Sequence, residues 1–562
     1  MSRRKNKPTR RVQVPIEQLN AIVERTRTEP LAEADHATLQ AAVETLARLT
    51  EELETKTTTL ERVRRLIFGP RSEATDTVLG KEQKDESEDA TAANPSAAGE
   101  ASAATDGDTP RQPPRPGHGR NGAEKYPRAP RIPVTHAAFK QGDPCPEPGC
   151  TGRLYVQRQE PALLVRVTGV APLQARVYAL ERLRCGLCGT VFTPDPPPGV
   201  GPAKYDESAA AMIALLKYGC GLPFHRIQRL EQALAIPLPA TTQWDVVQQA
   251  ATRIAPAFGA LAEQAAQGSV LYNDDTPMRI LKFTAAARAE ALPPGAKAER
   301  TGVFTSGVVA ETANGPIALF KTGPCHAGEH LAAVLDRRQD PQAPIQMSDA
   351  LARNRPGDHA TQAASCIPHG RRKFLEVYES FPDEVAFVLE TLRPVFRTDQ
   401  QAQQEGLSPA ARLLLHQQES GPRMQALRDW MARQFADHLV EPNSGLGQAI
   451  TYLQNHWEKL TLFLRVPGAP LSNNLCERAL KKAILHRKNS LFYRTLNGAT
   501  VGDRFMSLIH TAELHQVEPF DYLVALLRHP GALALEPAAW MPWNYTAALA
   551  RLASEATDPA PD

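Results

Sequence analysis

The chain has 562 residues, of which 42% are hydrophobic and 22% are charged, so it is long enough for several globular domains. The net charge of +2 excludes a strongly basic or acidic protein, although short basic runs occur. No apolar run approaches the roughly 20 residues of a membrane-spanning helix, and the N-terminus lacks a signal-peptide core. With only eight cysteines, the sequence favours a cytoplasmic protein without a disulfide framework or a membrane partner.

Residues 1–69 combine a basic tail with a helical pattern in which leucines recur every seven residues from Leu39 to Leu60. This spacing indicates a coiled-coil helix and hence a homo-oligomer, but an amphipathic helix packed on its own chain is equally compatible with it. Residues 70–135 are rich in small and polar residues and almost lack aromatic ones. That composition predicts a disordered linker.

Four cysteines lie in two close pairs within residues 136–200, and strand-like sequence joins the pairs. Knuckles of paired cysteines joined by strands are typical of a zinc ribbon, in which four thiolates close a structural Zn²⁺ site. Four unligated structural cysteines are the alternative. The predicted zinc ligands are Cys145, Cys150, Cys185 and Cys188.

Residues 201–266 read as helical, with segments predicted at 208–218, 222–234 and 241–265. Short helices joined by turns are compatible with a helix-turn-helix DNA-binding domain. They are equally compatible with a plain helical packing unit.

A short apolar run that begins at Ser269 leads to two adjacent acids, Asp274 and Asp275, followed by Thr276-Pro277. Asp is depleted in strands and a buried charge is costly, so acids at this point need a reason. A bound metal ion is one reason. A solvated turn is the other, and this stretch taken alone favours the turn.

The following elements are predicted as strands at 301–309 and 316–321, a helix at 326–338 and a strand at 343–347. An Asn314-Gly315 turn would join the first two as a hairpin. The last strand stops at Asp349. Three strands, a helix and a strand that ends at an acid are typical of a ribonuclease-H-like sheet, in which carboxylates on neighbouring strand ends meet.

Helix is the main pattern from about residue 369 to residue 464. Ser472 and Asn473 are then good N-cap residues for a further helix, which would carry Glu477 in its first turns. A basic tract follows within the same helix.

Together these pieces resemble the large transposase of the bacterial insertion sequence 66 family. The matching stretches keep their order from Leu66 to Arg528. The residue before the asparagine pair is Ser472, where the family usually has an acid. The stretches include KYGCGLPFHR at 217–226, DDTPMRIL at 274–281, CIPHGRRKF at 366–374, SNNLCERALK at 472–481 and HRKNSLF at 486–492.

The resemblance implies a multidomain α/β enzyme with a ribonuclease-H-like catalytic core. The zinc ribbon and the N-terminal coiled-coil helix would precede this core. The catalytic domain would span 267–530, with a helical insertion at about 375–465, and 531–562 would be a C-terminal tail.

The implied activity is that of a DDE transposase, with Asp274, Asp349 and Glu477 as its catalytic acids. Asp274 would contact both of two Mg²⁺ ions, for which Mn²⁺ could substitute, and the other acids would each hold one. Water attacks in the cleavage step and the freed 3′ hydroxyl attacks in strand transfer. Because Asp274 and Asp275 face opposite sides of a strand, only one can be the ligand, and the family pattern favours Asp274.

The resemblance also implies double-stranded DNA as partner, both transposon ends and target, and small accessory proteins. Six residues in two basic runs are predicted to bind DNA phosphates, with solvated helix faces as the alternative. They are Arg371, Arg372, Lys373, Arg487, Lys488 and Asn489.

Two rival functions keep some of these features. A catalytically inactive or repurposed copy would bind element ends without cutting them. A zinc-ribbon transcription regulator with an oligomerising helix would leave Asp274, Asp349 and Glu477 without a role.

Overall fold

The computed structural model describes residues 203–292 and 300–557 without a break. It also describes parts of residues 16–40 and 138–201, and the single residue Thr75. Among these described residues, no helix is both long enough and apolar enough to cross a membrane.

Several predicted features lie outside the described residues. They include the leucine seam beyond Leu39, nearly all of the linker at 70–135, and two of the four paired cysteines, Cys185 and Cys188. The coiled coil and the linker therefore stay predictions.

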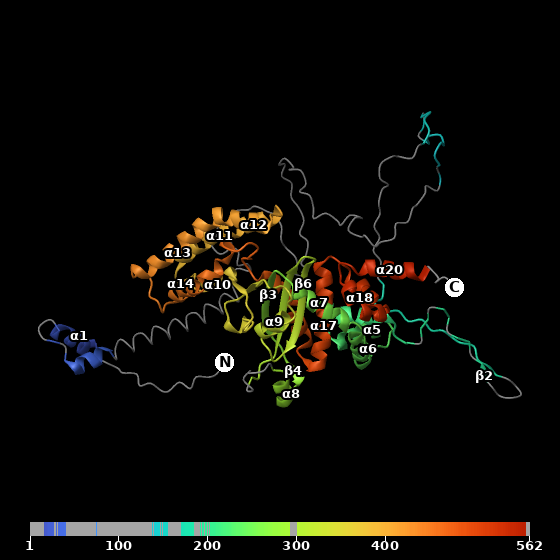
Figure 1. Ribbon diagram of the computed structural model, residues 1–562, viewed down its shortest axis with the longest axis horizontal. Helices are drawn as coiled ribbons and strands as arrows, with labels where there is room; N and C mark the ends of the chain where they lie inside the picture. Colours follow the sequence, from blue (N-terminus) through green and yellow to red (C-terminus); the bar gives the residue numbers. More distant parts are fainter. Residues whose placement is uncertain are drawn as a thin grey trace, which may run out of the picture. The chain divides into compact units, whose positions relative to one another are not determined.

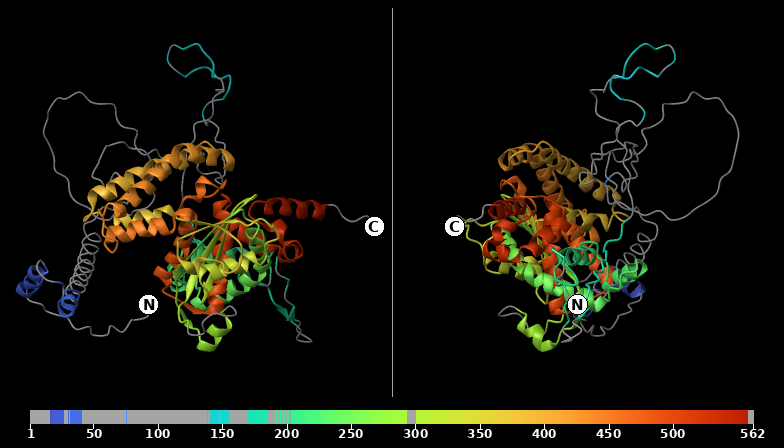
Figure 2. Two further views of the ribbon diagram at one scale, coloured as in Figure 1. Left: turned by 60° about the vertical axis from the view of Figure 1, so that its left-hand side comes forward. Right: turned by 90° about the vertical axis from the view of Figure 1, so that its right-hand side faces the viewer.

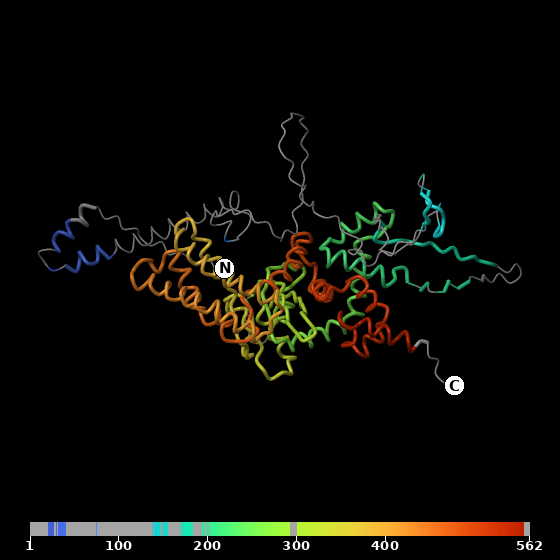
Figure 3. Tube along the Cα trace, turned by 90° about the horizontal axis from the view of Figure 1, so that it is seen from above, coloured from blue at the N-terminus to red at the C-terminus, as the bar shows by residue number. Residues whose placement is uncertain are grey.

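The described residues form two compact units, each built from two separate stretches of the chain. One unit combines residues 1–89 with 367–471, and the other combines residues 90–366 with 472–562. The first contains helix α1 (Ile16–Arg25) and the helices between residues 367 and 471, and the second contains a central sheet. Figure 3 traces the chain as it leaves the sheet unit and later returns to it.

A five-stranded sheet forms the centre of the second unit (Figure 1). Its strands are β3 (Val270–Pro277), β5 (Phe304–Thr312), β6 (Gly315–Gly323), β7 (Ile345–Ser348) and β8 (Gln362–Ser365). They lie in the order β6-β5-β3-β7-β8. The pairs on the β6 side of β3 are antiparallel, and those on the β7 side are parallel. A mixed α/β architecture, as predicted, is confirmed.

The predicted hairpin is confirmed, but its turn lies one residue earlier. Thr312 pairs with Gly315, so the turn residues are Ala313-Asn314 rather than Asn314-Gly315. Gly315 follows the turn with φ +108°, a conformation that disfavours any residue with a Cβ. A Cβ there would also lie 2.7 Å from the His515 ring, so glycine fits this position for two reasons.

Helix α17 (Leu496–Leu514) closes the outer edge of β6 with hydrogen bonds from its side chains. An edge strand presents unpaired backbone N–H groups, which need partners when they are buried. Asp503, Ser507 and Thr511 lie one helical turn apart and accept hydrogen bonds from the N–H groups of Thr322, Phe320 and Ala318 at 2.7–3.1 Å. A single face of α17 therefore protects this edge. Figure 2 shows the sheet and its flanking helices from two further sides.

Asp503 is the acidic member of this edge, and it is buried. Burial raises the pKa of its carboxyl group to about 6, although hydrogen bonds from Thr322 and the charge of Lys321 act in the other direction. Its charge in turn contributes to the raised pKa values of Tyr218 and Tyr493. An acid whose pKa is raised in the folded state loses stabilisation as it ionises, here between about pH 4 and about pH 6.

We expect Asp503→Asn to remove this pH dependence, because a carboxamide still accepts from the Thr322 N–H and carries no charge. A shift of about two pKa units corresponds to about 3 kcal/mol. Relative to wild type, the variant should therefore gain up to about 3 kcal/mol of unfolding free energy between about pH 4 and about pH 7. Urea unfolding of wild type and variant at both pH values measures this difference in unfolding free energy. Ser507→Ala, which loses a neutral partner on the same helix face, is the control. A wild-type-to-variant difference independent of pH would contradict the prediction.

In the described part of the second unit, four helices precede the sheet: α4 (Glu207–Ala214), α5 (Phe224–Ala233), α6 (Ala240–Arg253) and α7 (Ala255–Ala265). A π-helical turn, η2 (Leu215–Gly219), follows α4. The sequence predicted one helix over 241–265, and the structure divides it at Ile254. Pro256 in the first turn of α7 explains the break, because proline has no N–H to continue the helical ladder.

Two short strands, β4 (Ile280–Lys282) and β9 (Tyr493–Thr495), pair in parallel beside the main sheet. Helix α8 (Ala285–Glu290) follows β4. Ile280, Tyr493 and nearby apolar side chains form a small core there.

The end of the chain is helical up to Thr557, although the sequence left residues 531–562 as a tail. Its elements are α18 (Pro519–Arg528), α19 (Pro530–Leu535), the 3₁₀ turn η6 (Pro537–Trp540) and α20 (Tyr545–Thr557). The first three each begin at a proline, which is favourable in a first turn and unfavourable inside a helix. The hydroxyl of buried Tyr522 donates to the Trp540 carbonyl at 2.9 Å and joins these elements.

Residues 367–471 of the first unit are helical, as the sequence predicted for most of this stretch. The elements are α10 (Ile367–Leu375), α11 (Pro382–Gln404), α12 (Pro409–Leu415), the π turn η4 (His416–Ser420), α13 (Gly421–Ala436), α14 (Gly445–Asn455), α15 (Trp457–Leu460) and the 3₁₀ turn η5 (Leu462–Leu464).

A buried polar network holds these helices together. Asp399 of α11 lies 2.6 Å from Arg412 and 3.2 Å from His416 Nε2. His416 Nδ1 in turn lies 2.9 Å from the hydroxyl of Ser420. Ser, His and Asp thus follow one another as in a hydrolase triad, but His416 and Ser420 are each only 1% exposed. No substrate reaches them, so the network is structural.

Candidate active site

The two adjacent acids of β3 face opposite sides of the sheet, as the alternation of strand side chains predicts. Asp274 pairs across the ladder with Gly307 of β5. A Cβ on Gly307 would lie 3.3 Å from Cys476 Sγ, so a helix passes close to the sheet on that face. Asp275 lies on the other face, where its Oδ2 is 3.0 Å from His326 Nδ1.

The second predicted acid, Asp349, directly follows β7, which ends at Ser348 as expected. β7 is parallel to β3, and Met347 pairs with Tyr272. Continuing this register brings Asp349 level with Asp274, because the ends of neighbouring parallel strands meet at one sheet edge. The Asp349 carboxylate accepts the Leu351 N–H at 3.1 Å.

The third predicted acid, Glu477, lies in the first turn of helix α16 (Asn474–Ser490), which crosses β3 and β5. The Cys476 thiol donates to the carbonyl of Gly307 at 3.4 Å and fixes the start of the helix against the sheet. Asn473 occupies the N-cap position, but its side chain does not cap the helix. The predicted N-cap position is thus confirmed without a side-chain cap, because the Asn473 amide instead donates to the Asn273 carbonyl of β3 at 3.3 Å.

The electrostatics of Asp274 reflect a cluster of acids. Burial first, and then the charges of Asp349, Asp275 and Glu477, raise the pKa of the Asp274 carboxyl group to about 7. The same charges of Asp274 and Glu477 add to burial in raising the pKa of the Cys476 thiol. Asp349 and Glu477 therefore both lie within electrostatic reach of Asp274.

The three predicted acids are a suitable donor set for a divalent cation. Mg²⁺ prefers hard oxygen ligands and uses a few carboxylates together with water and phosphate. A carboxylate whose pKa is raised by neighbouring acids gains stability when a cation joins the group. Asp274, Asp349 and Glu477 are the residues that could hold such an ion.

In the second basic run of the predicted DNA-binding residues, some side chains already bind other parts of the protein. The Arg487 guanidinium donates to Thr276 Oγ1 at 2.8 Å, just after the acids of β3. The Asn489 amide donates to the Gly221 carbonyl at 3.2 Å. Both side chains therefore have structural partners, whereas Lys488 is exposed.

The first basic run lies on α10 of the other unit. Arg371 donates to Thr75 Oγ1 at 3.2 Å, and Arg372 and Lys373 are exposed. The structure thus divides the predicted DNA-binding residues between two units.

Sequence reasoning missed two basic residues on the exposed face of α16. Arg478, Lys481 and Lys488 are exposed. Lys481 comes three residues after Arg478 and Lys488 seven residues after Lys481, so all three lie on one face of the helix. The same spacing is visible in the sequence, so a helical projection of the tract would have found them. Lys482, four residues after Arg478, instead pairs with Glu513 at 2.8 Å and is 16% exposed.

Two of the four predicted zinc ligands, Cys145 and Cys150, lie within the described residues. The Cys145 N–H donates to the Gly152 carbonyl at 2.9 Å. The Gly152 backbone, followed by the Cys145 thiol, lowers the pKa of Cys150 through hydrogen bonds. The two described thiols thus lie together, as zinc ligands must. Strands β1 (Leu183–Arg184) and β2 (Val191–Phe192) pair around the other two cysteines, which lie outside the described residues.

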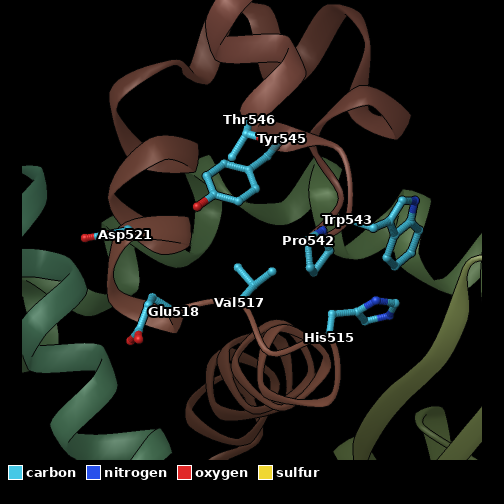
Figure 4. Close-up of a pocket in the computed structure, with 8 residues that line it drawn as sticks. All are labelled: His515, Val517, Glu518, Asp521, Pro542, Trp543, Tyr545 and Thr546. Carbon is cyan, nitrogen blue, oxygen red and sulfur yellow. The ribbon is translucent and has the colours of Figure 1, made fainter. Parts of the chain in front are cut away.

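A separate pocket of about 560 Å³ lies between α18 and α20 and contains none of the predicted acids. In Figure 4, Trp543 and His515 lie on one side of it and Glu518 and Asp521 on the other. These two acids are at the N-terminal end of α18, where a carboxylate interacts favourably with the helix dipole. Helix stabilisation accounts for them without a ligand.

Comparison with known proteins identifies the class of the chain. The sequence profile described as "Transposase IS66 family" matches residues 203–501, which is more than half of the chain. The matched residues include β3 with its acids and all of α16. The chain therefore belongs to the insertion sequence 66 family of transposases. Membership of this family suggests use of a divalent metal and DNA as a partner.

Three proteins of Sinorhizobium fredii, each described as uncharacterized, are similar to this chain. They are y4jD, 29% identical over 203 residues, y4hP, 25% identical over 398 residues, and y4qI, 25% identical over 350 residues. The alignments cover 35%, 66% and 60% of this chain, and 39%, 68% and 62% of the relatives. The chain thus spans less than two thirds of y4jD and of y4qI. No solved structure matches the chain.

Proposed function

We propose that this chain is a DDE transposase that binds the ends of an insertion sequence in the cytoplasm and catalyses metal-dependent strand cleavage and strand transfer. The observation that carries the proposal is the cluster of Asp274, Asp349 and Glu477, whose charges act on one carboxyl group. The strand order β6-β5-β3-β7-β8, with its change from antiparallel to parallel pairing at β3, supports a ribonuclease-H-like core.

The proposed chemistry needs no nucleophilic side chain. The oxygen of water attacks a phosphorus atom of the DNA, and the bond from phosphorus to the 3′ oxygen breaks. The freed 3′ hydroxyl then attacks a target phosphate in the same way. Asp274, Asp349 and Glu477 would hold two Mg²⁺ ions, whose charge would help to activate the attacking oxygen and stabilise the leaving oxygen.

The protein's part is to hold the three carboxylates in fixed positions. Asp274 and Asp349 come from adjacent parallel strands, so the sheet sets their separation. Glu477 comes from a helix that is hydrogen-bonded to the sheet at its start through Cys476. Arg487 binds Thr276 Oγ1 further along the same helix, so α16 is held to β3 beyond the acids as well.

DNA would lie along the exposed face of α16 that begins beside Glu477. Arg478, Lys481 and Lys488 offer positive charge along about 15 Å of helix, at 1.5 Å per residue. Basic side chains in a row bind successive phosphates and position the duplex without reading its sequence. The helical region α4–α7 and the basic residues of α10 are further DNA contacts in this proposal.

We expect the double substitution Lys481→Gln and Lys488→Gln to weaken DNA binding at all sequences. Each lost phosphate contact reduces the slope of log affinity against log salt by about 0.9, so the slope should fall by about 2. Fluorescence anisotropy with a labelled duplex between about 50 mM and about 200 mM salt measures this slope. Lys482→Gln is the matched control, because its ammonium group pairs with Glu513. An unchanged slope in the double variant would contradict the assignment of this face.

The predicted zinc ribbon, homo-oligomer and accessory proteins complete the proposal. The contact between Cys145 and Cys150 supports the first half of a four-thiolate Zn²⁺ site. Such a site would be structural, because four protein ligands leave no open position.

The proposal is tested with purified full-length protein and a duplex that carries an end of its element. We expect cleavage and joining with Mg²⁺ or Mn²⁺ and neither with EDTA. Specific binding without cutting under all metal conditions would support an inactive end-binding protein instead. Neither specific binding nor cutting, together with regulation of a promoter, would support a transcription regulator.

A further inference from the structure

The loop that carries Asp349 is held by a buried polar network. Asn354, in the 3₁₀ turn η3 (Ala352–Asn354), is fully buried, and its amide Nδ2 donates to Asp349 Oδ1 at 2.5 Å. The Leu351 N–H donates to the same oxygen. One carboxylate oxygen of the second acid is therefore fixed by its own loop.

The same asparagine binds the strand of the first acid. The backbone carbonyl of Asn354 accepts from the side chain of Asn273 at 2.8 Å and from that of Gln346 at 2.7 Å. Gln346 Nε2 also donates to Asn273 Oδ1 at 3.0 Å. The side chains of Asn273 and Gln346 are therefore bonded to each other as well as to the backbone of Asn354. All three residues are at most 2% exposed. A buried network of this kind is rigid because each broken bond leaves a buried group unsatisfied.

Asp275, which follows Asp274 in β3, also contacts the η3 loop. Its side chain is 1% exposed, and its Oδ1 lies 3.4 Å from the guanidinium of Arg353. Its Oδ2 binds His326 and the N–H of Ala327, at the start of helix α9 (Ala327–Leu335). Asp275 therefore joins three elements on the face of the sheet opposite Asp274.

The residues on either side of Asp274, Asn273 and Asp275, thus both contact the η3 loop. Side chains alternate along a strand, so the residues before and after Asp274 share the opposite face. One strand can then hold a metal ligand on one face and the loop of a second ligand on the other. From this geometry we infer that Asn354 and Arg353 are positioning residues for Asp349, held by the two neighbours of the first acid.

This inference rests on the proposed function, because it assumes that Asp274 and Asp349 share a cation. Partners that hold a metal-binding carboxylate or histidine typically change metal affinity or activity by 10- to 100-fold when they are removed. Asn354→Ala should therefore raise the dissociation constant for Mn²⁺ by about tenfold or more. Arg353→Ala should raise it in the same direction, and Arg353→Lys should restore part of the loss.

The test uses the full-length protein and Mn²⁺ as probe, with binding measured by isothermal titration calorimetry. The Mn²⁺ concentration for half-maximal DNA cleavage is a second readout, and saturating Mn²⁺ should restore the cleavage rate of Asn354→Ala. A general loss of stability would not respond to metal in this way. Asn544→Ala is the control, because it likewise removes a hydrogen-bonding asparagine side chain, which binds the Met541 N–H and the Ala538 carbonyl rather than Asp349. It should leave Mn²⁺ binding unchanged.

Mn²⁺ affinity within twofold of wild type in folded Asn354→Ala would overturn the inference. If that variant does not fold, Arg353→Ala decides, because its side chain is 43% exposed and its removal leaves no buried cavity. Unchanged affinity there would likewise overturn the inference. Other results would contradict the proposed function itself. These are wild-type protein that binds no Mn²⁺, or an Asp274→Asn variant that binds Mn²⁺ as well as wild type does.

Discussion

Replacement of Asp274 by asparagine is expected to lower the rate of DNA cleavage by about a thousandfold or more, with little change in DNA binding. The carboxamide keeps the shape of the side chain but loses the negative charge that holds a divalent cation. A bound metal supplies several kcal/mol of transition-state stabilisation, and each 1.36 kcal/mol is a factor of ten in rate. Single-turnover cleavage of a labelled element end, with anisotropy for binding, measures both quantities.

Asp340→Asn is the matched control, because Asp340 is an exposed aspartate that pairs with Arg338 away from the acids. It should cut at the wild-type rate. Glu477→Gln should behave like Asp274→Asn, since both carboxylates contribute charge to the same site. Cleavage by Asp274→Asn at the wild-type rate would exclude this residue as a catalytic acid.

The strands and the acids at their ends could be predicted because their signals are local. β3, β5, β6 and β7 are short apolar runs between turn residues, and Asp349 stands where such a run stops. β8 was missed, because its four residues, Gln362–Ser365, include little apolar or branched sequence. The helical stretch between 367 and 471 also followed from its pattern.

That Asp349 and Glu477 both lie near Asp274 could not be derived from local pattern, because it depends on pairings between distant parts of the chain. Asp274 and Asp349 come together only because β3 and β7 pair in parallel, with Tyr272 opposite Met347. Glu477 joins them after a long helical stretch that belongs to another unit. Family resemblance supplied this grouping at the level of sequence, while spacing alone did not.

The basic tract of α16 illustrates a different limit. Its composition predicted phosphate binding, but composition does not say which side of a helix a residue occupies. Arg487 turned out to donate to Thr276, and Lys482 to pair with Glu513, whereas Lys481 is exposed. The number of charges therefore indicates which helix is a candidate for phosphate binding. The position of each residue around the helix, together with its contacts, indicates which residues are candidates.

The network around Asn354 was missed for a related reason. Asparagine is common in turns, so a sequence gives no cause to link Asn273 with Asn354. Their link follows from the fold, which brings the end of β3 against the loop after β7. Such partners become visible only when the backbone is in place.

Gly328→Ala is expected to destabilise the protein by about 3 kcal/mol, at the upper end of the cost of overpacking. Gly328 lies in the first turn of α9, where the backbone of the η3 loop crosses it. A Cβ there would overlap the carbonyl oxygen of Arg355 and lie 2.6 Å from that of Arg353. Backbone atoms cannot move aside as a flexible side chain can, so the loop or the helix must shift.

The sign of this effect is informative, because alanine is ordinarily the better helix former by up to about 1 kcal/mol. Gly259→Ala in α7 is the matched control, since a Cβ at Gly259 meets no atom within 4 Å. Thermal unfolding should therefore show a lower midpoint for Gly328→Ala and an equal or higher one for Gly259→Ala. A displaced η3 loop would also move Asp349, so Gly328→Ala should bind Mn²⁺ more weakly. Equal midpoints and equal Mn²⁺ affinity in both variants would mean that the contact of α9 with this loop does not hold the second acid.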